Sequence, residues 1–249
     1  MKSVLVTGGA KRVGAAISRR YADAGWHVVI HYHSSQDAAE RLAAELPSAE
    51  TVRCDLADGD AAVAMIESLA ERLEDWRALV NNASVFAEDN VAGLEPETAR
   101  NGYQVNAVTP ARMAQTFLAK TRSEAGRHVI QITDQKLRNP NPAFFSYTMS
   151  KHAAAAAADM MAMAADGPDG IYSLAPGAIL PSHDQSEEEA ERSHRMNLLR
   201  RRTRASEVAD AAVFLASGHL DSGQALYVDS GQHLLSQPRD VLYLARGER

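Results

Sequence analysis

The stretch VLVTGGAKRVG (residues 4–14) decides the fold of this 249-residue chain. Its first four residues form a short apolar run that favours a buried strand. Gly8 and Gly14 then permit a tight turn and a close approach of the backbone, and a helical segment follows. A helix N-terminus after such a turn favours an anion, because free N–H groups and the helix dipole point at it. We therefore expect the phosphates of a dinucleotide cofactor at this turn.

The same alternation of a short apolar run and a longer helical segment continues along the chain. The expected strands are 4–7, 27–32, 51–54, 78–80, 128–133, 171–174 and 225–228, and the expected helices are 12–24, 35–46, 60–73, 96–123, 146–165 and 206–216. This order predicts the α/β class with a doubly wound, mostly parallel sheet, in which ligands bind at the carboxyl ends of the strands. Residues 1–235 are expected to form one domain. The tail at 236–249 is expected to be either a small added element or a disordered end.

Composition narrows the class of protein. The chain is 45% hydrophobic and carries a net charge of −6, so one large domain is expected and nucleic acid is not an expected partner. The single cysteine, Cys54, excludes an internal disulfide framework. No membrane span is expected, and the nine histidines do not combine with cysteines or acids at the spacing of metal ligands. The first residues lack the features of a signal peptide, so cytoplasm is the expected location.

The glycine-rich turn has the spacing T-G-x-x-x-R-x-G, in which Lys11 and Arg12 add two cations. The second expected strand ends in HYHSS, and no acid lies between residues 31 and 36. A site that prefers NAD usually has an acid there, on the ribose 2′-hydroxyl. The candidate donors to a 2′-phosphate are Lys11, His33, Ser34 and Ser35. NADPH is therefore the expected cofactor. Asp55 is expected either to accept from the adenine amino group or to begin a helix.

A second stretch, VIQITDQKLRNPNPAFFSYTMSK (129–151), has the residues for proton transfer. It runs from an apolar strand through a polar loop into an alanine-rich helix. Tyr147 and Lys151 are four residues apart, so they lie on one face of that helix. An ammonium beside a phenol lowers the phenol's pKa, which makes Tyr147 a candidate proton donor. The alternative is an ordinary pair that faces the solvent.

With TGGAKRVG, NNAS (81–84), VNAVTP (105–110), YTMSK (147–151) and SLAPG (173–177), the chain resembles the short-chain dehydrogenase/reductases. The motifs occur in that family's order and span about residues 1–235. The resemblance implies a single-domain Rossmann-type sheet of about seven strands in the order 3-2-1-4-5-6-7, with helices on both faces. It also implies NAD(P)-dependent hydride transfer and a homo-oligomer, usually a tetramer.

The finer resemblance is to the pteridine reductases and dihydromonapterin reductases. It rests on Arg12, on HYHSS, on the aromatic residue in NNASVF, on VDSGQHL, and above all on Asp134, where a generic family member has Ser. It implies NADPH-dependent reduction of a C=N bond in a pterin or dihydropterin, such as dihydromonapterin, dihydrobiopterin or dihydrofolate. One departure is Ser34, which replaces an Arg of protozoan-type pteridine reductases and weakens the preference for NADPH.

The resemblance also implies a role for each site residue. The implied catalytic residues are Asn106, Asp134, Tyr147 and Lys151. Lys151 would lower the pKa of Tyr147 and hold the nicotinamide ribose, Asn106 would kink the fourth helix and anchor a relay water, and Asp134 would bridge Tyr147 to the ring nitrogen. The implied cofactor-binding residues are Gly8, Lys11, Arg12, Val13, His33, Ser34, Ser35, Asp55, Leu56, Asn81, Ala83, Ser84, Tyr147, Lys151, Pro176 and Gly177. The implied substrate-binding residues are Arg12, Ser84, Phe86, Asp134 and Tyr147, with Phe86 stacked on the pterin.

Several alternatives remain open at this point. Phe86 is otherwise a core residue, and Asp134 otherwise caps the loop after the fifth strand. The charged segment 181–204 is either a solvated helical surface or a mobile lid over the site. The whole chain is otherwise a carbonyl reductase, for example of 3-oxoacyl thioesters, or a regulator that binds NADPH without catalysis. Asp134 argues against the carbonyl reductase, and the intact Asn106, Tyr147 and Lys151 argue against the regulator.

Overall fold

One parallel sheet forms the centre of the molecule. The computed structural model describes residues 1–181 and 185–248, and in this part of the chain seven strands pair in the order β3-β2-β1-β4-β5-β6-β7. They are β1 (Ser3–Val6), β2 (His27–Tyr32), β3 (Ala49–Arg53), β4 (Trp76–Asn81), β5 (His128–Ile132), β6 (Gly170–Pro176) and β7 (Ala225–Val228). The predicted fold class and strand order are confirmed.

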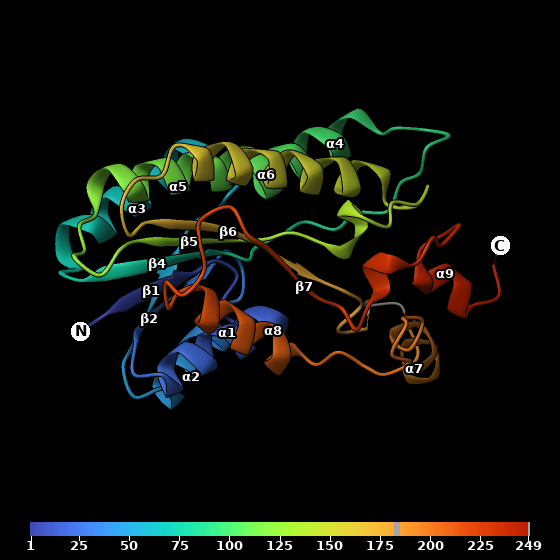
Figure 1. The fold of residues 1–249 in the computed structure, drawn as a ribbon, viewed down its shortest axis with the longest axis horizontal. Helices are drawn as coiled ribbons and strands as arrows, with labels where there is room; N and C mark the ends of the chain where they lie inside the picture. Colours follow the sequence, from blue (N-terminus) through green and yellow to red (C-terminus); the bar gives the residue numbers. More distant parts are fainter. Residues whose placement is uncertain (182–184, 249) are drawn as a thin grey trace.

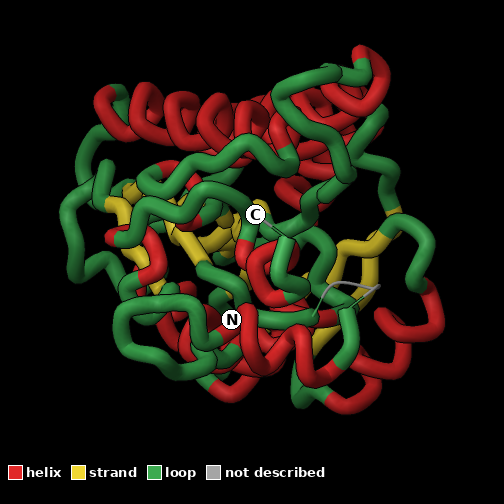
Figure 2. Tube along the Cα trace, turned by 90° about the vertical axis from the view of Figure 1, so that its right-hand side faces the viewer, coloured by secondary structure: helices red, strands yellow, loops and turns green. Residues whose placement is uncertain are grey.

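Helices cover both faces of the sheet (Figure 1). On one face lie α1 (Arg12–Asp23), α2 (Gln36–Glu45) and α8 (Ala205–Leu215), and on the other lie α3 (Gly59–Arg72), α4 (Pro96–Tyr103), α5 (Thr109–Lys120) and α6 (Phe145–Met163). Figure 2 shows the strands between these two layers. Alternate strand residues enter two separate cores, since Val4 and Val28 pack with α1 while Leu5 and Val29 pack with α3 and α5. Burial on both faces explains the nearly continuous apolar strand sequences.

The helix expected at 96–123 is interrupted. A π-helical segment (Gln104–Val108) separates α4 from α5, at the residue where the family resemblance implied a kink. Asn106 lies in this segment and is buried. Its side chain bonds to the loop after β4 and to α6, and a wider helical turn accommodates those bonds.

Two further helices lie at one end of the molecule, α7 (Glu187–His194) and α9 (Val241–Ala245) (Figure 1). They pack against each other, and Ser186 and Glu189 form a capping box at the start of α7. The charged segment 181–204 therefore contains a helix, while its residues 182–184 lie outside the described part. The tail forms an added element: Leu242 and Tyr243 cluster with Phe144 and Tyr147. Among the described helices, none is long and apolar enough to cross a membrane.

Candidate active site

A cavity of about 290 Å³ opens where β1, β4, β5 and β6 end. Nine residues singled out from the sequence line it: Arg12, Val13, Ser84, Phe86, Asp134, Tyr147, Lys151, Pro176 and Gly177. The remaining predicted residues do not line this cavity: Gly8, Lys11, His33, Ser34, Ser35, Asp55, Leu56, Asn81, Ala83 and Asn106. The structure thus brings the expected proton donor, its neighbours and the expected stacking residue together at one place.

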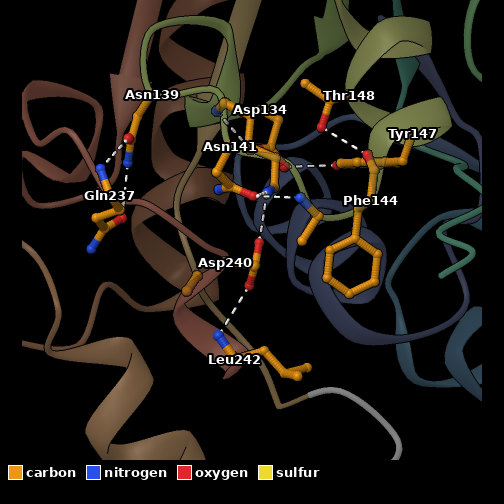
Figure 3. Close-up of polar contacts among 12 residues, drawn as sticks. Asp134, Asn139, Asn141, Phe144, Tyr147, Thr148, Gln237, Asp240 and Leu242 are labelled. Atoms are coloured by element: carbon orange, nitrogen blue, oxygen red, sulfur yellow. Dashed lines mark hydrogen bonds and ion pairs between the residues drawn. The ribbon is translucent and has the colours of Figure 1, made fainter. Parts of the chain in front are cut away.

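Asp134 makes two hydrogen bonds at the wall of the cavity. Its Oδ2 accepts from the Tyr147 hydroxyl at 2.7 Å (Figure 3). Its Oδ1 accepts from the backbone N–H of Lys136 at 2.8 Å, which caps a short 3₁₀ helix (Gln135–Leu137). The loop-capping alternative is therefore present, and the same carboxyl group also contacts Tyr147, while its bridge to a ring nitrogen stays a prediction.

The electrostatics of this group differ from the expectation. Burial and the neighbouring Asp134 raise the pKa of Tyr147 well above its usual value. Lys151 donates to the carbonyl of Ile132 at 2.8 Å, and burial lowers the pKa of its ammonium to about 8. The predicted lowering of the Tyr147 pKa by Lys151 was therefore wrong, because desolvation of the phenolate outweighs the attraction of the ammonium. Burial also raises the pKa of Asp134, so this carboxyl group takes up a proton more readily than a solvated one.

Asn106 fastens the loop after β4 to α6. Its Oδ1 accepts from the Ser84 hydroxyl and the Val85 N–H, and its Nδ2 donates to the Val85 carbonyl and the Ser150 hydroxyl. These four bonds fill the donors and acceptors of the amide. Asn106 thereby holds two walls of the cavity together. Its anchoring of a relay water stays a prediction.

Phe86 stands at the mouth of the cavity. Its side chain is 47% exposed, so the alternative of a core residue was wrong. Its ring stacks on Phe144 with a centroid separation of 4.1 Å and meets Tyr147 edge-on at 4.6 Å. This arrangement fixes the ring beside the proton donor and leaves aromatic surface for a flat ligand.

The glycine-rich turn is shaped for close contact between backbones. Gly8 has φ +59°, and a Cβ on Gly14 would lie 2.1 Å from the Gly8 carbonyl oxygen. Sequence reasoning missed Thr7 and Asn82, which tie the turn to β4. The Thr7 hydroxyl accepts from the Asn82 N–H at 2.9 Å, and the Asn82 amide donates to the Thr7 carbonyl at 2.8 Å. Asn81 points elsewhere, toward the Pro110 carbonyl of α5.

The start of α1 fits an anionic group. None of the described side chains caps this helix, and its first turn contains no acid. The first N–H groups of a helix lack partners within it, so they face outward from the turn. Lys11 is the residue that precedes the helix, and it is exposed. These features fit the phosphates of a dinucleotide.

His31 was also missed, although it lies inside the window searched for an acid. Its Nδ1 accepts from the Gly8 N–H at 3.1 Å, and its Nε2 donates to the Cys54 carbonyl at 3.1 Å. Burial lowers the pKa of His31 to about 4. The neutral ring therefore joins the turn after β1 to the end of β3.

Three of the four residues proposed for a 2′-phosphate, His33, Ser34 and Ser35, lie around the start of α2. His33 and Ser34 are exposed, and Ser35 precedes α2 without capping it through its side chain. Asp55 lies 3.7 Å from His33 and accepts from the Ala57 N–H. Asp55 does not cap α3, because Asp58 holds that position.

Arg12 lies on the substrate side of the turn. Its guanidinium donates to the Pro181 carbonyl at 3.0 Å, and its φ of 53° is in the left-handed region. It thereby connects the start of α1 to the loop after β6.

The far wall of the cavity comes from residues that the sequence did not single out. It is lined by Gln135, Lys136, Gln185, Ser193, His194, Gln232, Asp240, Val241 and Leu242. Gln232 accepts from the Ala178 N–H at 3.0 Å and so holds the loop after β6. Two signals pointed to this wall: VDSGQHL contains Gln232, and the segment 181–204, with a lid over the site as one alternative, contains Gln185, Ser193 and His194. Among the described residues, no cluster of three or more His, Cys, Asp or Glu could hold a metal ion.

Comparisons with known proteins agree with this geometry. A family model described as enoyl-(acyl carrier protein) reductase matches residues 8–233. The solved FolM alternative dihydrofolate reductase 1 from Brucella canis, complexed with NADP, is 33% identical, with a TM-score of 0.88 over 94% of this chain and 95% of that one. A Serratia marcescens short-chain dehydrogenase/reductase mutant has a TM-score of 0.85 at 24% identity over 93% and 98%, a likeness of fold alone.

Two of the curated relatives are named for different activities. Ketoacyl reductase 2 of the granaticin polyketide synthase from Streptomyces violaceoruber is 26% identical over 93% of this chain and 96% of its own length. The dihydromonapterin reductase of Escherichia coli O6:K15:H31 is 22% identical over the same shares.

The buried His31 gives a testable pH dependence. In the unfolded chain its imidazole titrates near pH 6.5. Between about pH 6.5 and 4 the unfolded state therefore binds more protons, and stability falls as the pH falls. We expect a loss on the order of 3 kcal/mol in the free energy of unfolding from this group. Urea unfolding of the wild type and His31→Gln at several pH values measures it. A difference between the two proteins that does not change with pH would contradict this assignment.

Proposed function

The chain belongs to the short-chain dehydrogenase/reductase family, and we propose that it transfers hydride from NADPH to a C=N bond of a pterin or dihydropterin. It is an oxidoreductase of this family. The observation that supports the pterin substrate best is the hydrogen bond between Asp134 and Tyr147 at the cavity wall. The Brucella canis structure with NADP supports the cofactor.

A carboxyl group at position 134 suits a ring nitrogen better than a ketone. Reduction of a carbonyl group places negative charge on the oxygen, and a carboxylate beside it would repel that charge. A C=N nitrogen is more basic than a carbonyl oxygen, so it can accept its proton as the hydride arrives, and less negative charge then develops beside the carboxylate. The paired Asp134 and Tyr147 hold such a proton.

The residues divide the work as follows. When bound, the nicotinamide supplies the hydride. Tyr147 gives its hydroxyl proton to the nitrogen next to the reduced carbon, and the Asp134 carboxyl group then passes a replacement proton from water to the phenolate. Lys151, buried one helical turn away, stabilises the transient negative charge and holds the ribose. Tyr147 keeps its proton at neutral pH because its pKa is raised, which is the state that a donor needs.

Two residues at the mouth would orient the substrate. Phe86 offers its half-exposed ring to a flat heterocycle. Arg12 lines the cavity, and its guanidinium can donate to a ring oxygen once it leaves the Pro181 carbonyl.

From the family resemblance we also propose a homotetramer in the cytoplasm.

Reduction of a 3-oxoacyl thioester is the second candidate. The granaticin ketoacyl reductase among the relatives favours it. Both candidates use the same Tyr147 and Lys151, so position 134 separates them.

A substrate panel tests the proposal directly. NADPH oxidation is followed with dihydromonapterin, dihydrobiopterin, dihydrofolate and a 3-oxoacyl thioester, for the wild type and Asp134→Ser. We expect turnover of a pterin or folate that falls at least about a hundredfold in kcat in Asp134→Ser, because proton return is lost. Turnover of the thioester alone would overturn the pterin proposal in favour of the carbonyl reductase.

Tyr147→Phe tests the proton donor. Removing the hydroxyl should lower kcat at least about a hundredfold while NADPH binding survives, since general acid catalysis contributes on that scale. Steady-state kinetics and NADPH fluorescence titration give the two readouts. Tyr227→Phe, an alteration of a half-buried tyrosine on β7, is the control and should leave kcat unchanged. Full turnover in Tyr147→Phe would remove this residue from the reaction.

Lys11→Gln tests the 2′-phosphate site. We expect the wild type to prefer NADPH to NADH, and we expect the variant to lose about tenfold in kcat/KM for NADPH alone, through a lost charge-assisted bond. Lys120→Gln, at the end of α5, is the control for loss of an exposed lysine. An equal loss of kcat/KM with NADH would show that Lys11 does not bind the 2′-phosphate.

A further inference from the structure

The tail reaches the loop that carries Asp134 through a buried ion pair. The Lys136 ammonium lies 2.7 Å from Asp240 Oδ2 and 3.1 Å from Asn141 Oδ1. The side chain of Lys136 is 3% exposed and that of Asp240 is 13% exposed. Asp240 also begins α9, because its Oδ1 accepts from the Leu242 N–H at 3.0 Å (Figure 3). Each oxygen of this carboxylate therefore has a partner, one in the loop and one in the tail.

A second contact between the tail and the same loop is made by Asn139, three residues after Lys136. Asn139 donates to Gln237 Oε1 at 2.8 Å and accepts from the Gln237 N–H at 3.0 Å (Figure 3). Gln237 also donates to the Met196 carbonyl, which follows α7. The tail thus bonds to the loop after β5 and to the segment after α7, and Val241 and Leu242 line the cavity between them.

We propose that Lys136 and Asp240 are positioning residues, through which the C-terminal tail sets the place and the charge environment of Asp134. This inference rests on the proposed role of Asp134 in pterin reduction. Lys136 connects the two ends physically: its backbone N–H holds Asp134 Oδ1, and its ammonium holds Asp240. Displacement of the tail would therefore displace the carboxyl group that bonds to Tyr147.

A purely structural role does not explain well why Lys136 and Asp240 form a buried ion pair. A buried ion pair contributes little net stability compared with packed apolar side chains, because both charges lose their hydration. Here it also lies beside a reacting carboxyl group. The charged and titratable groups around Asp134 are Tyr147 and Lys151 from α6, Lys136 from its own loop, and Asp240 behind Lys136. The Lys136 ammonium favours the carboxylate form of Asp134, and Asp240 partly cancels that effect.

Two variants change this environment in opposite directions. Lys136→Met removes the cation, so Asp134 should titrate at higher pH than in the wild type. Asp240→Asn keeps an oxygen to cap α9 and removes the anion, so Asp134 should titrate at lower pH. The titration is read from the ¹³Cγ resonance of Asp134 in aspartate-labelled full-length protein, identified by its loss in Asp134→Ser. If Lys136 and Asp240 had no electrostatic role, the Asp134 titration would shift in the same direction in both variants or not at all. Either result would overturn the proposal.

Kinetics supply the second readout. With the substrate that the wild type reduces, we expect both variants to lose about 10- to 100-fold in kcat, because a small displacement of a reacting group costs that much. The KM for NADPH should stay unchanged. Arg127→Met is the matched control: it removes the partner of Asp169 in a partly buried ion pair at the opposite ends of β5 and β6. It should lower Tm and leave both kcat and the Asp134 titration unchanged.

The two readouts separate the failure of this proposal from that of the proposed function. If the wild type reduces no pterin or folate, the proposed function fails, while the Asp134 titration still decides whether Lys136 and Asp240 act on it. If the wild type reduces a pterin but both variants keep full kcat and an unshifted titration, only the positioning role fails.

Discussion

The buried hydrogen bond between Asp134 and Tyr147 is the interaction on which the candidate site depends. A carboxyl group and a phenol that share one proton inside a protein each shift the other's pKa. Burial makes both groups hold protons more tightly, and the neighbouring Lys136 and Lys151 limit that effect for Asp134. The ease with which this pair gives up its proton therefore depends on the surrounding cations. This dependence gives a physical reason for the polar structure that encloses it.

The cofactor end obeys a different constraint. The turn after β1 must bring its backbone close to a ligand, and a free glycine-rich loop would lose entropy on binding. Thr7 and Asn82 bond the turn to the end of β4, and His31 bonds it to the end of β3. All three strands end at the same edge of a parallel sheet, so the sheet itself supplies these partners. The turn is held in place before any ligand arrives.

The sequence predicted the sheet, and the family resemblance added its strand order and nine of the residues that line the cavity. Strand and helix periods are local, and the motifs after β1, β4, β5 and β6 converge because parallel strands end together. It was insufficient where distant segments meet. The contact of Asp240 with Lys136 joins two polar residues whose sequences carry no joint signal. The sequence also did not give the direction in which the pKa of Tyr147 shifts. That direction depends on burial, which the spacing of Tyr147 and Lys151 does not reveal. The family resemblance implied a kink at Asn106, but its π-helical form could not be predicted, since it depends on a set of tertiary hydrogen bonds.

The molecule has two parts, the strand–helix alternation and the polar segments outside it. The sheet, the glycine-rich turn and the helix with Tyr147 and Lys151 belong to the first part, and the fold that they form is shared with solved relatives. In the proposed reaction Asp134 passes the proton, but a carboxyl group in the cavity wall needs support of its own. That support comes from the loop after β5 and the tail, which lie outside the strand–helix alternation. Under the proposed function, the acid at position 134 and the elements that hold it therefore act together.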